Sequence, residues 1–426
     1  MSEEKKKIKV LVLGDHPLAP SGVGSQLRNI IEILLGSGRY QFVCLGGAMK
    51  HENYEPQNIT GEDWEDGDWK IFPVDGYGNA EMVRSLLWTE KPDILLFMTD
   101  PRFYPWLWQV ENEIRPLVPM VYYHVWDNFP LPHYNKKWYD STDVIASISK
   151  VTYDIVSGVA PDVENHYIPH SVHNDVFRKL SDEETKTYKL KNMPEGSEDK
   201  MIFFWNNRNA RRKMSGSLIY WFSEFADEVG PENVCLIMHT DAKDPHGQDL
   251  ETVIRDHNMD DGRVVISNQK VPPHVLGAMY NMADCTVNIS DAEGFGLGTL
   301  ESLSCETPII VNMTGGLQEQ VTDGEEWFGV GIEAASRAVI GSQDVPYIYE
   351  DRISKEDFIA ALHKMYNMSK EEREELGRKG KEHVNKNYNF ESFKKNWLTL
   401  MDGVYDRYGS WENRKGYKAW GMKEIA

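Results

Sequence analysis

The chain has few cysteines, only four in 426 residues, and no pair of them has C-x-x-C spacing. They are Cys44, Cys235, Cys285 and Cys305, each in apolar surroundings. A disulfide framework needs several cysteines in an oxidising compartment, and a cysteine metal site needs closely paired ligands. We therefore expect four buried thiols in a reducing compartment and no metal site built from cysteine.

Long apolar runs and excess positive charge are also missing. No stretch reaches the roughly 18 apolar residues of a membrane-spanning helix, and the first apolar run, Ile8–Leu13, is too short for a secretion signal. The chain has 46 Lys and Arg residues against 67 Asp and Glu residues, a net charge of −21. Such an acidic balance disfavours a broad nucleic-acid surface. We expect a cytoplasmic protein without an integral membrane segment.

The sequence has the composition and the alternating pattern of a folded α/β protein. Hydrophobic residues make up 41% of it, and its length suits two domains of roughly 200 residues each. Short β-branched runs alternate with amphipathic helical stretches, which predicts parallel sheets covered on both faces. The strands expected in the first half are Ile8–Leu13, Gln41–Leu45, Trp69–Phe72, Asp93–Met98 and Pro119–Tyr123. The helices expected between them include Ser25–Leu35, Ala80–Thr89 and Phe103–Ile114.

One stretch of the second half combines glycines, a helix start and two carboxylates. A predicted strand leads into Gly294, Gly296 and Gly298, and a helix follows. Glycines let the backbone approach a ligand closely, and the start of a helix favours negative charge, so a phosphate site is expected. A carboxylate repels phosphate, so Glu301 more plausibly accepts hydrogen bonds from hydroxyls such as those of a ribose. The pattern predicts a nucleotide carrying a hydroxyl-rich group.

The same stretch carries a family resemblance. Glu293 and Glu301, with seven residues between them, together with the later Gly315 and Gly316, resemble the E-x7-E signature of retaining glycosyltransferases of the GT-B fold, family 4 type. The resemblance implies that Glu301 binds the nucleotide ribose and that Glu293 lies at the donor sugar. It also implies that sugar and phosphate contact the backbone of Gly294, Phe295, Gly296 and Leu297.

A basic cluster follows the first strand expected in the second half. Arg208 and Lys213 are five residues apart, in the loop where a Rossmann-like domain would hold a diphosphate. They match the Arg and Lys that clamp the donor diphosphate in the family that the chain resembles. Arg211 and Arg212, between them, are interpreted as surface charges at a helix start.

Two sites in the first half also match the family. Gly22 and Gly24 lie between the first strand and the first helix and are similar to a glycine loop near the donor phosphate; a purely structural turn is the alternative. His124 follows a strand at the end where open α/β sheets bind ligands, and it matches a histidine held near the donor sugar. A structural role for His124 is the alternative.

Asp66 and Asp68 form a D-x-D arrangement, which metal-dependent glycosyltransferases of another fold use at the end of a strand. Here the two residues precede a strand, in a loop rich in acidic residues. We interpret them as a solvated charge run. We expect no metal site and no cofactor, with a nucleotide-diphosphate sugar as the donor substrate.

The resemblance implies a GT-B architecture with two Rossmann-like domains that face a cleft. The predicted boundaries are an acceptor domain at 1–177, a linker at 178–200 and a nucleotide-sugar domain at 201–388. The C-terminal helices, 389–426, would cross back to the first domain. Residues 178–200 are rich in charge and are expected to be poor in helix, which suits a linker between domains.

The predicted function is transfer of a sugar from a nucleotide-diphosphate sugar to a hydroxyl acceptor, with retention of configuration and without a metal. His124, Glu293, Arg208 and Lys213 are the candidate catalytic residues. The acceptor is left open between a glycan, a small molecule and a modified DNA base, since the run YYHVWDN also resembles phage-type enzymes whose relatives glycosylate hydroxymethylated DNA bases. A nucleotide-sugar epimerase, or a sugar-nucleotide binding module without turnover, is the further alternative.

Overall fold

The computed structural model describes residues 6–193 and 199–417, which form two compact units. Unit 1 comprises the described residues within Met1–His170, Ser342–Pro346 and Glu391–Ala426. Unit 2 comprises the described residues within Ser171–Gly341 and Tyr347–Phe390. The domain boundaries expected from the sequence, at residues 177, 200 and 388, remain predictions.

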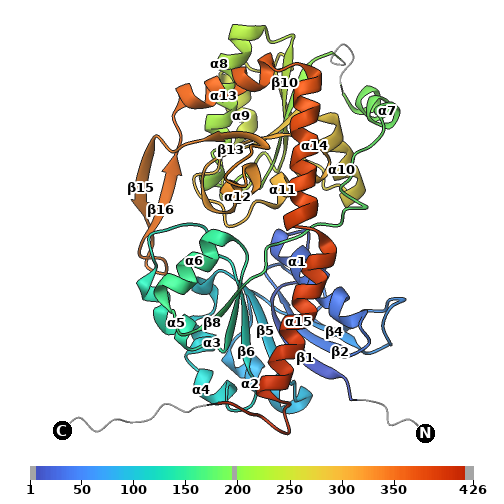
Figure 1. Ribbon diagram of the computed structural model, residues 1–426, viewed down its shortest axis with the longest axis vertical. Helices are drawn as coiled ribbons and strands as arrows, with labels where there is room; N and C mark the ends of the chain where they lie inside the picture. The colour runs from blue at the N-terminus through green and yellow to red at the C-terminus, as the bar shows by residue number, and fades with distance from the viewer. Residues whose placement is uncertain (1–5, 194–198, 418–426) are drawn as a thin grey trace, which may run out of the picture. The chain divides into compact units, whose positions relative to one another are not determined.

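Within its described part, unit 1 contains an eight-stranded sheet in the order β3-β4-β2-β1-β5-β6-β7-β8 (Figure 1). Neighbouring strands are parallel except for the antiparallel pair of β3 and β4. The strands are β1 (Ile8–Asp15), β2 (Tyr40–Gly47), β3 (Gln57–Asn58), β4 (Trp69–Pro73), β5 (Ile94–Thr99), β6 (Met120–His124), β7 (Val144–Ser147) and β8 (Glu164–Tyr167). The α-helices are α1 (Gly22–Leu35), α2 (Ala80–Glu90), α3 (Pro105–Trp108), α4 (Glu111–Ile114), α5 (Lys136–Asp140) and α6 (Lys150–Val159).

The long C-terminal helix α15 (Phe390–Tyr408) lies almost entirely in unit 1. Its Trp397 is fully buried, with its ring centroid 4.8 Å from that of Tyr123 on β6. The hydroxyl of Tyr40, at the start of β2, donates to Asp402 on the same helix. The apolar face of α15 is therefore part of the core of this unit.

Unit 2 contains, among the described residues, a six-stranded parallel sheet in the order β11-β10-β9-β12-β13-β14. The strands are β9 (Met201–Asn206), β10 (Val234–His239), β11 (Val264–Ser267), β12 (Cys285–Asn288), β13 (Ile309–Asn312) and β14 (Gly329–Ile332). The α-helices are α7 (Asp182–Asn192), α8 (Ser215–Val229), α9 (Leu250–Asp256), α10 (Pro273–Met282), α11 (Leu297–Ser304), α12 (Gln318–Val321), α13 (Lys355–Asn367) and α14 (Lys370–Asn387). Buried aromatic residues of β9 and α8, among them Phe203, Trp205 and Phe222, lie at the centre of its core.

The structure corrects two local predictions and adds one element that was not predicted. The helix expected at Phe103–Ile114 is divided: Phe103 ends a 3-10 turn, Pro105 starts α3, and α4 starts only at Glu111. Proline suits the first position of a helix, where its missing N–H has no helical partner. The linker contains helix α7, which starts with a capping box between Ser181 and Glu184; residues 194–198 of the linker lie outside the described part. A hairpin of β15 (Ser336–Ile340) and β16 (Ile348–Arg352) was not predicted at all.

Two sequence expectations can be compared directly with the described residues. All four cysteines are buried and free, as predicted. Among the described helices, none is long and apolar enough to cross a membrane.

Candidate active site

The predicted phosphate loop lies between β12 and α11 of unit 2, and four of the predicted donor-binding residues, Gly294–Leu297, are in it or at the helix start. Gly296 has a left-handed backbone with a φ of 92°, and no described side chain caps the helix that follows. The turn at Gly315 and Gly316, the second glycine turn, packs against this loop. A Cβ atom on Gly316 would lie 2.6 Å from the Cα atom of Phe295, so this position needs glycine. The first amide groups of α11 have no helical partner, an arrangement that favours an anion.

A buried ion pair lies beside this loop. Lys213 Nζ donates to Glu293 Oε2, and the two residues are only 7% and 9% exposed. Arg212 Nη1 lies 3.9 Å from the same oxygen. Burial alone would raise the pKa of Glu293, but the charges of Lys213 and Arg212 outweigh it and hold the pKa below its ordinary value. Glu293 is therefore an ionised carboxylate between two cations.

The surface interpretation needs correction for Arg212, whereas Arg211 is exposed as expected. Arg212 Nη1 donates to the carbonyl of Ala292 at 2.6 Å, and the Arg212 carbonyl accepts from the N–H of Asp291 at 2.8 Å. Arg211 has an exposed side chain, but its guanidinium pairs with Glu350, which is 1% exposed. The 3-10 helix η3 (Arg211–Lys213) thus packs on the phosphate loop and on β16, and local sequence could not reveal these distant contacts.

Arg208 engages a different carboxylate from Lys213. Its guanidinium donates to Asp244 at 2.6 and 3.2 Å and lies 2.7 Å from His246 Nδ1. The hydrogen bond from Arg208 lowers the pKa of Asp244 to about 2. The Arg208 side chain is 59% exposed. Binding of one diphosphate by both Arg208 and Lys213 therefore stays a prediction.

Glu301 lies in α11 and is partly buried. Tyr280 on α10 donates its hydroxyl to Glu301 Oε2 at 2.7 Å, and Asn206 Nδ2 donates to that hydroxyl at 2.8 Å. Burial raises the pKa of Glu301 to about 7, and the hydrogen bond from Tyr280 opposes this rise. Sequence reasoning missed Tyr280 and Asn206, because an aromatic residue in an apolar helix and an amide at a strand end carry no distinctive signal.

His124 lies at the end of β6 and is completely buried. Its Nδ1 is 3.0 Å from the hydroxyl of Tyr122, and its Nε2 is 2.7 Å from that of Tyr139. Burial lowers the pKa of His124 to about 3. The predicted catalytic role stays untested, but burial and two tyrosine partners agree better with the structural alternative.

Gly22 and Gly24 begin α1, where the Ser21 hydroxyl accepts from the Gly24 N–H at 3.0 Å. A Cβ on Gly24 would lie 2.7 Å from the His16 carbonyl, so close packing by itself requires glycine. Sequence reasoning missed Asp15 beside them. Its carboxylate is 8% exposed and accepts hydrogen bonds from Ser21 at 2.5 Å and from Tyr77 at 3.0 Å.

The D-x-D interpretation is wrong for one of its two residues. Asp68 is 8% exposed and accepts a hydrogen bond from Lys7 at 2.7 Å, so it is a paired and largely buried carboxylate. Asp66 is exposed, as expected of a solvated charge. Through this hydrogen bond, Asp68 in the loop before β4 contacts Lys7, the residue that precedes β1.

Strand β16 supplies two further buried carboxylates near the phosphate loop. Glu350 and Asp351 are 1% and 2% exposed. Asp351 Oδ2 accepts from the Thr314 hydroxyl at 2.9 Å, and the Asp351 N–H donates to the carbonyl of Asp291 at 2.8 Å. With the pairing of Arg211 and Glu350, these contacts join η3, the phosphate loop and the second glycine turn to one strand.

Comparison with known proteins agrees with this geometry. Residues 194–383 match the model of a family described as glycosyl transferases group 1. A D-inositol 3-phosphate glycosyltransferase of Arthrobacter sp. (strain FB24) is 34% identical over 118 residues, 27% of this chain and 27% of that protein. Another, of Acidothermus cellulolyticus, is 43% identical over 61 residues, 14% of each chain. The chain thus matches about a quarter or less of the length of these relatives.

Solved structures are similar over nearly the whole chain. A sucrose-phosphate synthase of Thermosynechococcus elongatus has a TM-score of 0.72 at 15% identity, covering 94% of this chain and all of that one. An α,α-trehalose 6-phosphate synthase of Burkholderia multivorans has a TM-score of 0.69 at 12% identity, covering 94% and 99%. Anabaena HepE in complex with UDP and glucose has a TM-score of 0.67 at 12% identity, covering 93% and 99%. These likenesses confirm the predicted α/β fold of the GT-B class, with two Rossmann-like domains.

Proposed function

Residues 194–383 match the glycosyltransferase group 1 family, and on that premise we propose that the protein transfers a sugar from a nucleotide-diphosphate sugar to a hydroxyl acceptor. We further propose that configuration is retained and that no metal is required. The observation that carries the proposal is the placement of Lys213 and Arg212 around Glu293, beside the uncapped start of α11.

The donor would bind to unit 2 through its diphosphate. Uncapped amide groups at a helix start attract an anion. Lys213 and Arg212 add two positive charges, of which the ionised Glu293 between them neutralises one, so this group keeps a net positive charge. UDP is the nucleotide we propose, because HepE, which shares the fold, was solved with UDP and glucose.

The chemical step breaks the bond between the anomeric carbon and the diphosphate oxygen, and the electron pair leaves with the diphosphate. The acceptor oxygen forms the new bond, and its proton goes to the departing phosphate oxygen. Negative charge grows on the leaving group, so Lys213 and Arg212 stabilise the transition state more than the bound donor. Their positive charge takes the part that a divalent cation plays in metal-dependent enzymes. Glu293 would orient the sugar.

Glu301 would bind the hydroxyls of the donor ribose. The Tyr280 hydroxyl donates to one carboxylate oxygen of Glu301. The ionised carboxylate has further lone pairs that can accept hydrogen bonds from two neighbouring ribose hydroxyls. Because burial raises its pKa to about 7, Glu301 is only partly ionised at neutral pH, and hydroxyl donors would favour the ionised form.

The direct test is release of UDP from UDP-glucose, and from other UDP-sugars, by the purified protein in excess EDTA. We expect slow release without an acceptor and faster release with a suitable one. Activity that EDTA abolishes and Mn²⁺ restores would contradict metal independence. Absence of release with every nucleotide sugar, despite tight binding of UDP, would instead favour a binding module without turnover.

A further inference from the structure

The two cations proposed to meet the donor, Arg212 and Lys213, belong to a segment with little stability of its own. They lie in η3, a single 3-10 turn of three residues, and such short turns have poor hydrogen-bond geometry. The next residue, Met214, has a left-handed backbone with a φ of 58°, which is unfavourable for a residue other than glycine. No described side chain caps helix α8, which starts after Met214. Contacts from other elements must therefore keep η3 in place.

Backbone contacts reach η3 from two loops. The Arg212 carbonyl accepts from the Asp291 N–H at 2.8 Å, and Arg212 Nη1 donates to the Ala292 carbonyl at 2.6 Å. The Arg211 N–H donates to the carbonyl of His246, in the loop after β10, at 3.1 Å. These bonds fix the main chain of η3. The Arg211 side chain provides a further contact, with a different element.

Arg211 and Glu350 form a two-pronged ion pair between η3 and β16. Arg211 Nη1 donates to Glu350 Oε2 at 3.2 Å, and Nη2 donates to Oε1. The Arg211 side chain is 63% exposed, whereas that of Glu350 is 1% exposed. Burial alone would raise the pKa of Glu350, but hydrogen bonds from Arg211 and Arg352 outweigh it and hold the pKa below its ordinary value. Glu350 is therefore an ionised carboxylate held under the protein surface.

A buried carboxylate is a poor means of stabilising a fold for its own sake. Removing a charge from water is costly, and apolar residues of similar volume often stabilise a protein as well as a buried ion pair does. What the ion pair supplies is geometry, because two parallel hydrogen bonds fix both the distance and the direction of a guanidinium. The pair of Arg211 and Glu350 thus sets the position of the first residue of η3.

Strand β16 is itself bonded to the rest of the phosphate site. The Asp351 N–H donates to the carbonyl of Asp291 in the phosphate loop at 2.8 Å. Asn312, at the end of β13, donates its Nδ2 to the Asp351 carbonyl at 2.6 Å. The hydroxyl of Thr314, just before the second glycine turn, donates to Asp351 Oδ2 at 2.9 Å. Glu350 is therefore presented to η3 from a strand that is already fixed to the loop, the sheet and the turn.

We propose that Glu350 is a positioning residue of the donor site. Its bidentate bond to Arg211 holds η3 in place, and η3 in turn holds Lys213 and Arg212 beside Glu293. The inference rests on the proposed function, because it concerns the two cations that would stabilise the departing diphosphate. Glu350 and Arg211 act on the leaving group only through η3. Misplaced cations would lose more of their effect on the growing charge of the transition state than on the bound donor.

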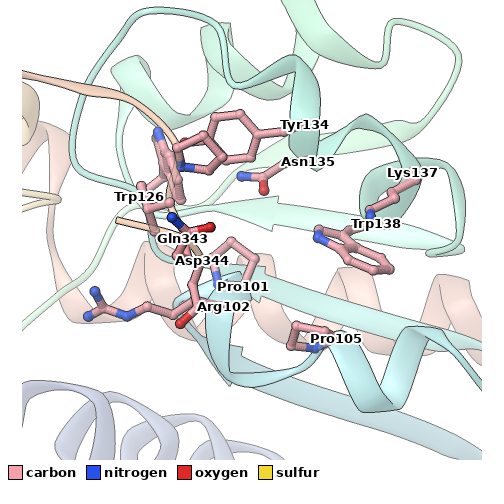
Figure 2. A pocket seen from close by; sticks show the side chains of 12 residues that line it. Pro101, Arg102, Pro105, Trp126, Tyr134, Asn135, Lys137, Trp138, Gln343 and Asp344 are labelled. Carbon is pink, nitrogen blue, oxygen red and sulfur yellow. The ribbon is translucent and has the colours of Figure 1, made fainter. Parts of the chain in front are cut away.

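The turn of the same hairpin supplies a control for this proposal. Gln343–Pro346 belong to unit 1, and there they line a pocket of ≈ 210 Å³ with Trp126 (Figure 2). Asp344 is exposed in this turn and lies outside β16. Asp344→Asn therefore changes a charge of the hairpin without changing the pair of Arg211 and Glu350.

Arg211→Gln and Arg352→Gln are the matched pair of test variants. Both arginines bind Glu350, Arg352 through Nη2 at 3.0 Å, but only Arg211 belongs to η3. We expect Arg211→Gln to lower kcat for release of UDP from UDP-glucose by roughly tenfold to hundredfold, since a shift of about 1 Å can cost 10²-fold. The Kd of UDP should rise by a smaller factor. Arg352→Gln and Asp344→Asn should stay within about twofold of the wild type, as expected for exposed charges.

Glu350→Gln and the double variant Arg211→Gln/Glu350→Gln separate positioning from loss of folding. Glu350→Gln should lower kcat as Arg211→Gln does, because each removes the same contact. The double variant leaves no unpaired carboxylate at this position, so its urea midpoint should be the closer to that of the wild type, yet its kcat should be no higher than that of either single variant. Tighter binding of UDP by Glu350→Gln would instead make Arg211 a direct ligand of the diphosphate, and recovery of kcat in the double variant would reduce Glu350 to a stability role. Either result overturns the inference.

Hydrogen exchange of the backbone amides of residues 211–216, measured without ligand, tests the contact independently of turnover. Exchange should be faster in Arg211→Gln and in Glu350→Gln than in the wild type, and unchanged in Arg352→Gln. Unchanged exchange in Arg211→Gln, or equal loss of kcat in Arg211→Gln and Arg352→Gln, refutes this inference and leaves the proposed function standing. A wild type that never releases UDP, with faster exchange and weaker UDP binding in Arg211→Gln, refutes the proposed function alone.

Discussion

Replacing Lys213 with methionine tests the buried ion pair beside the phosphate loop. Lys213 and Glu293 are 7% and 9% exposed, so their interaction is screened little by solvent. Removing one partner of a buried pair costs about 3–5 kcal/mol, because the other charge is left without compensation. Arg212 remains 3.9 Å from Glu293, so we expect a loss of unfolding free energy at the lower end of this range, about 3 kcal/mol at pH 7.

The loss should depend on pH in a defined direction. In the wild type the pKa of Glu293 lies below its ordinary value of 4.5, so its contribution to stability is present above that pH and is lost as pH falls through the folded pKa. In Lys213→Met, burial dominates and raises the pKa of Glu293 above 4.5. The difference between variant and wild type is therefore largest at pH 7 and shrinks as pH falls toward 4.5.

Urea unfolding at pH 7.0, 6.0 and 5.0 measures this difference. The double variant Lys213→Met/Glu293→Gln should recover more than half of the loss at pH 7, since it removes the carboxylate charge that Lys213→Met leaves without its buried partner. Arg208→Met is the matched control, because Arg208 is 59% exposed, and it should cost less than about 1 kcal/mol. A loss that is the same at every pH and is not relieved by Glu293→Gln would refute the ion-pair reasoning.

Three further predictions concern other residues. Tyr280→Phe removes a hydrogen bond that lowers the pKa of Glu301, so this pKa should rise above about 7. The pH above which the donor KM falls should then move upward, and an unchanged profile of donor KM against pH would contradict this. Trp397→Ala should destabilise unit 1 by about 3–5 kcal/mol in urea unfolding, because it leaves a cavity beside Tyr123, and a loss under about 1 kcal/mol would contradict its place in the core. His124→Gln should leave the profile of UDP release between pH 5 and 8 unchanged in shape, since the pKa of His124 is about 3, whereas loss of an inflection there would identify His124 as a titrating group.

Much of the fold could be predicted because its signals are local. Buried parallel strands such as β1 and β5 are continuous apolar runs, and helices such as α14 start with capping residues that the sequence displays, here Ser369 and Glu372. The hairpin of β15 and β16 lacks such a signal. The side chains of β15 are largely exposed or half-buried. Strand β16 buries two adjacent acidic residues, Glu350 and Asp351, a pattern that fits neither alternation nor a buried apolar run.

The candidate site was predictable at its backbone and less so in its side-chain partners. The glycines and carboxylates of the phosphate loop have a fixed spacing that the sequence displays directly. The pairing of Lys213 with Glu293 joins residues 80 positions apart, and that of Arg211 with Glu350 joins residues 139 apart. Tertiary packing determines such pairs. The same limit explains why the burial of His124 between two tyrosines was not anticipated.

The stereochemistry of sugar release shows whether the protein is a metal-independent transferase that retains configuration. Proton NMR of UDP-glucose with the wild-type protein in excess EDTA follows the anomeric proton of the first-formed product, before mutarotation. We expect an α-configured product together with free UDP, and loss of most of this activity in Lys213→Met at an intact fold. A β-configured product, or turnover only after a divalent cation is added, would contradict it.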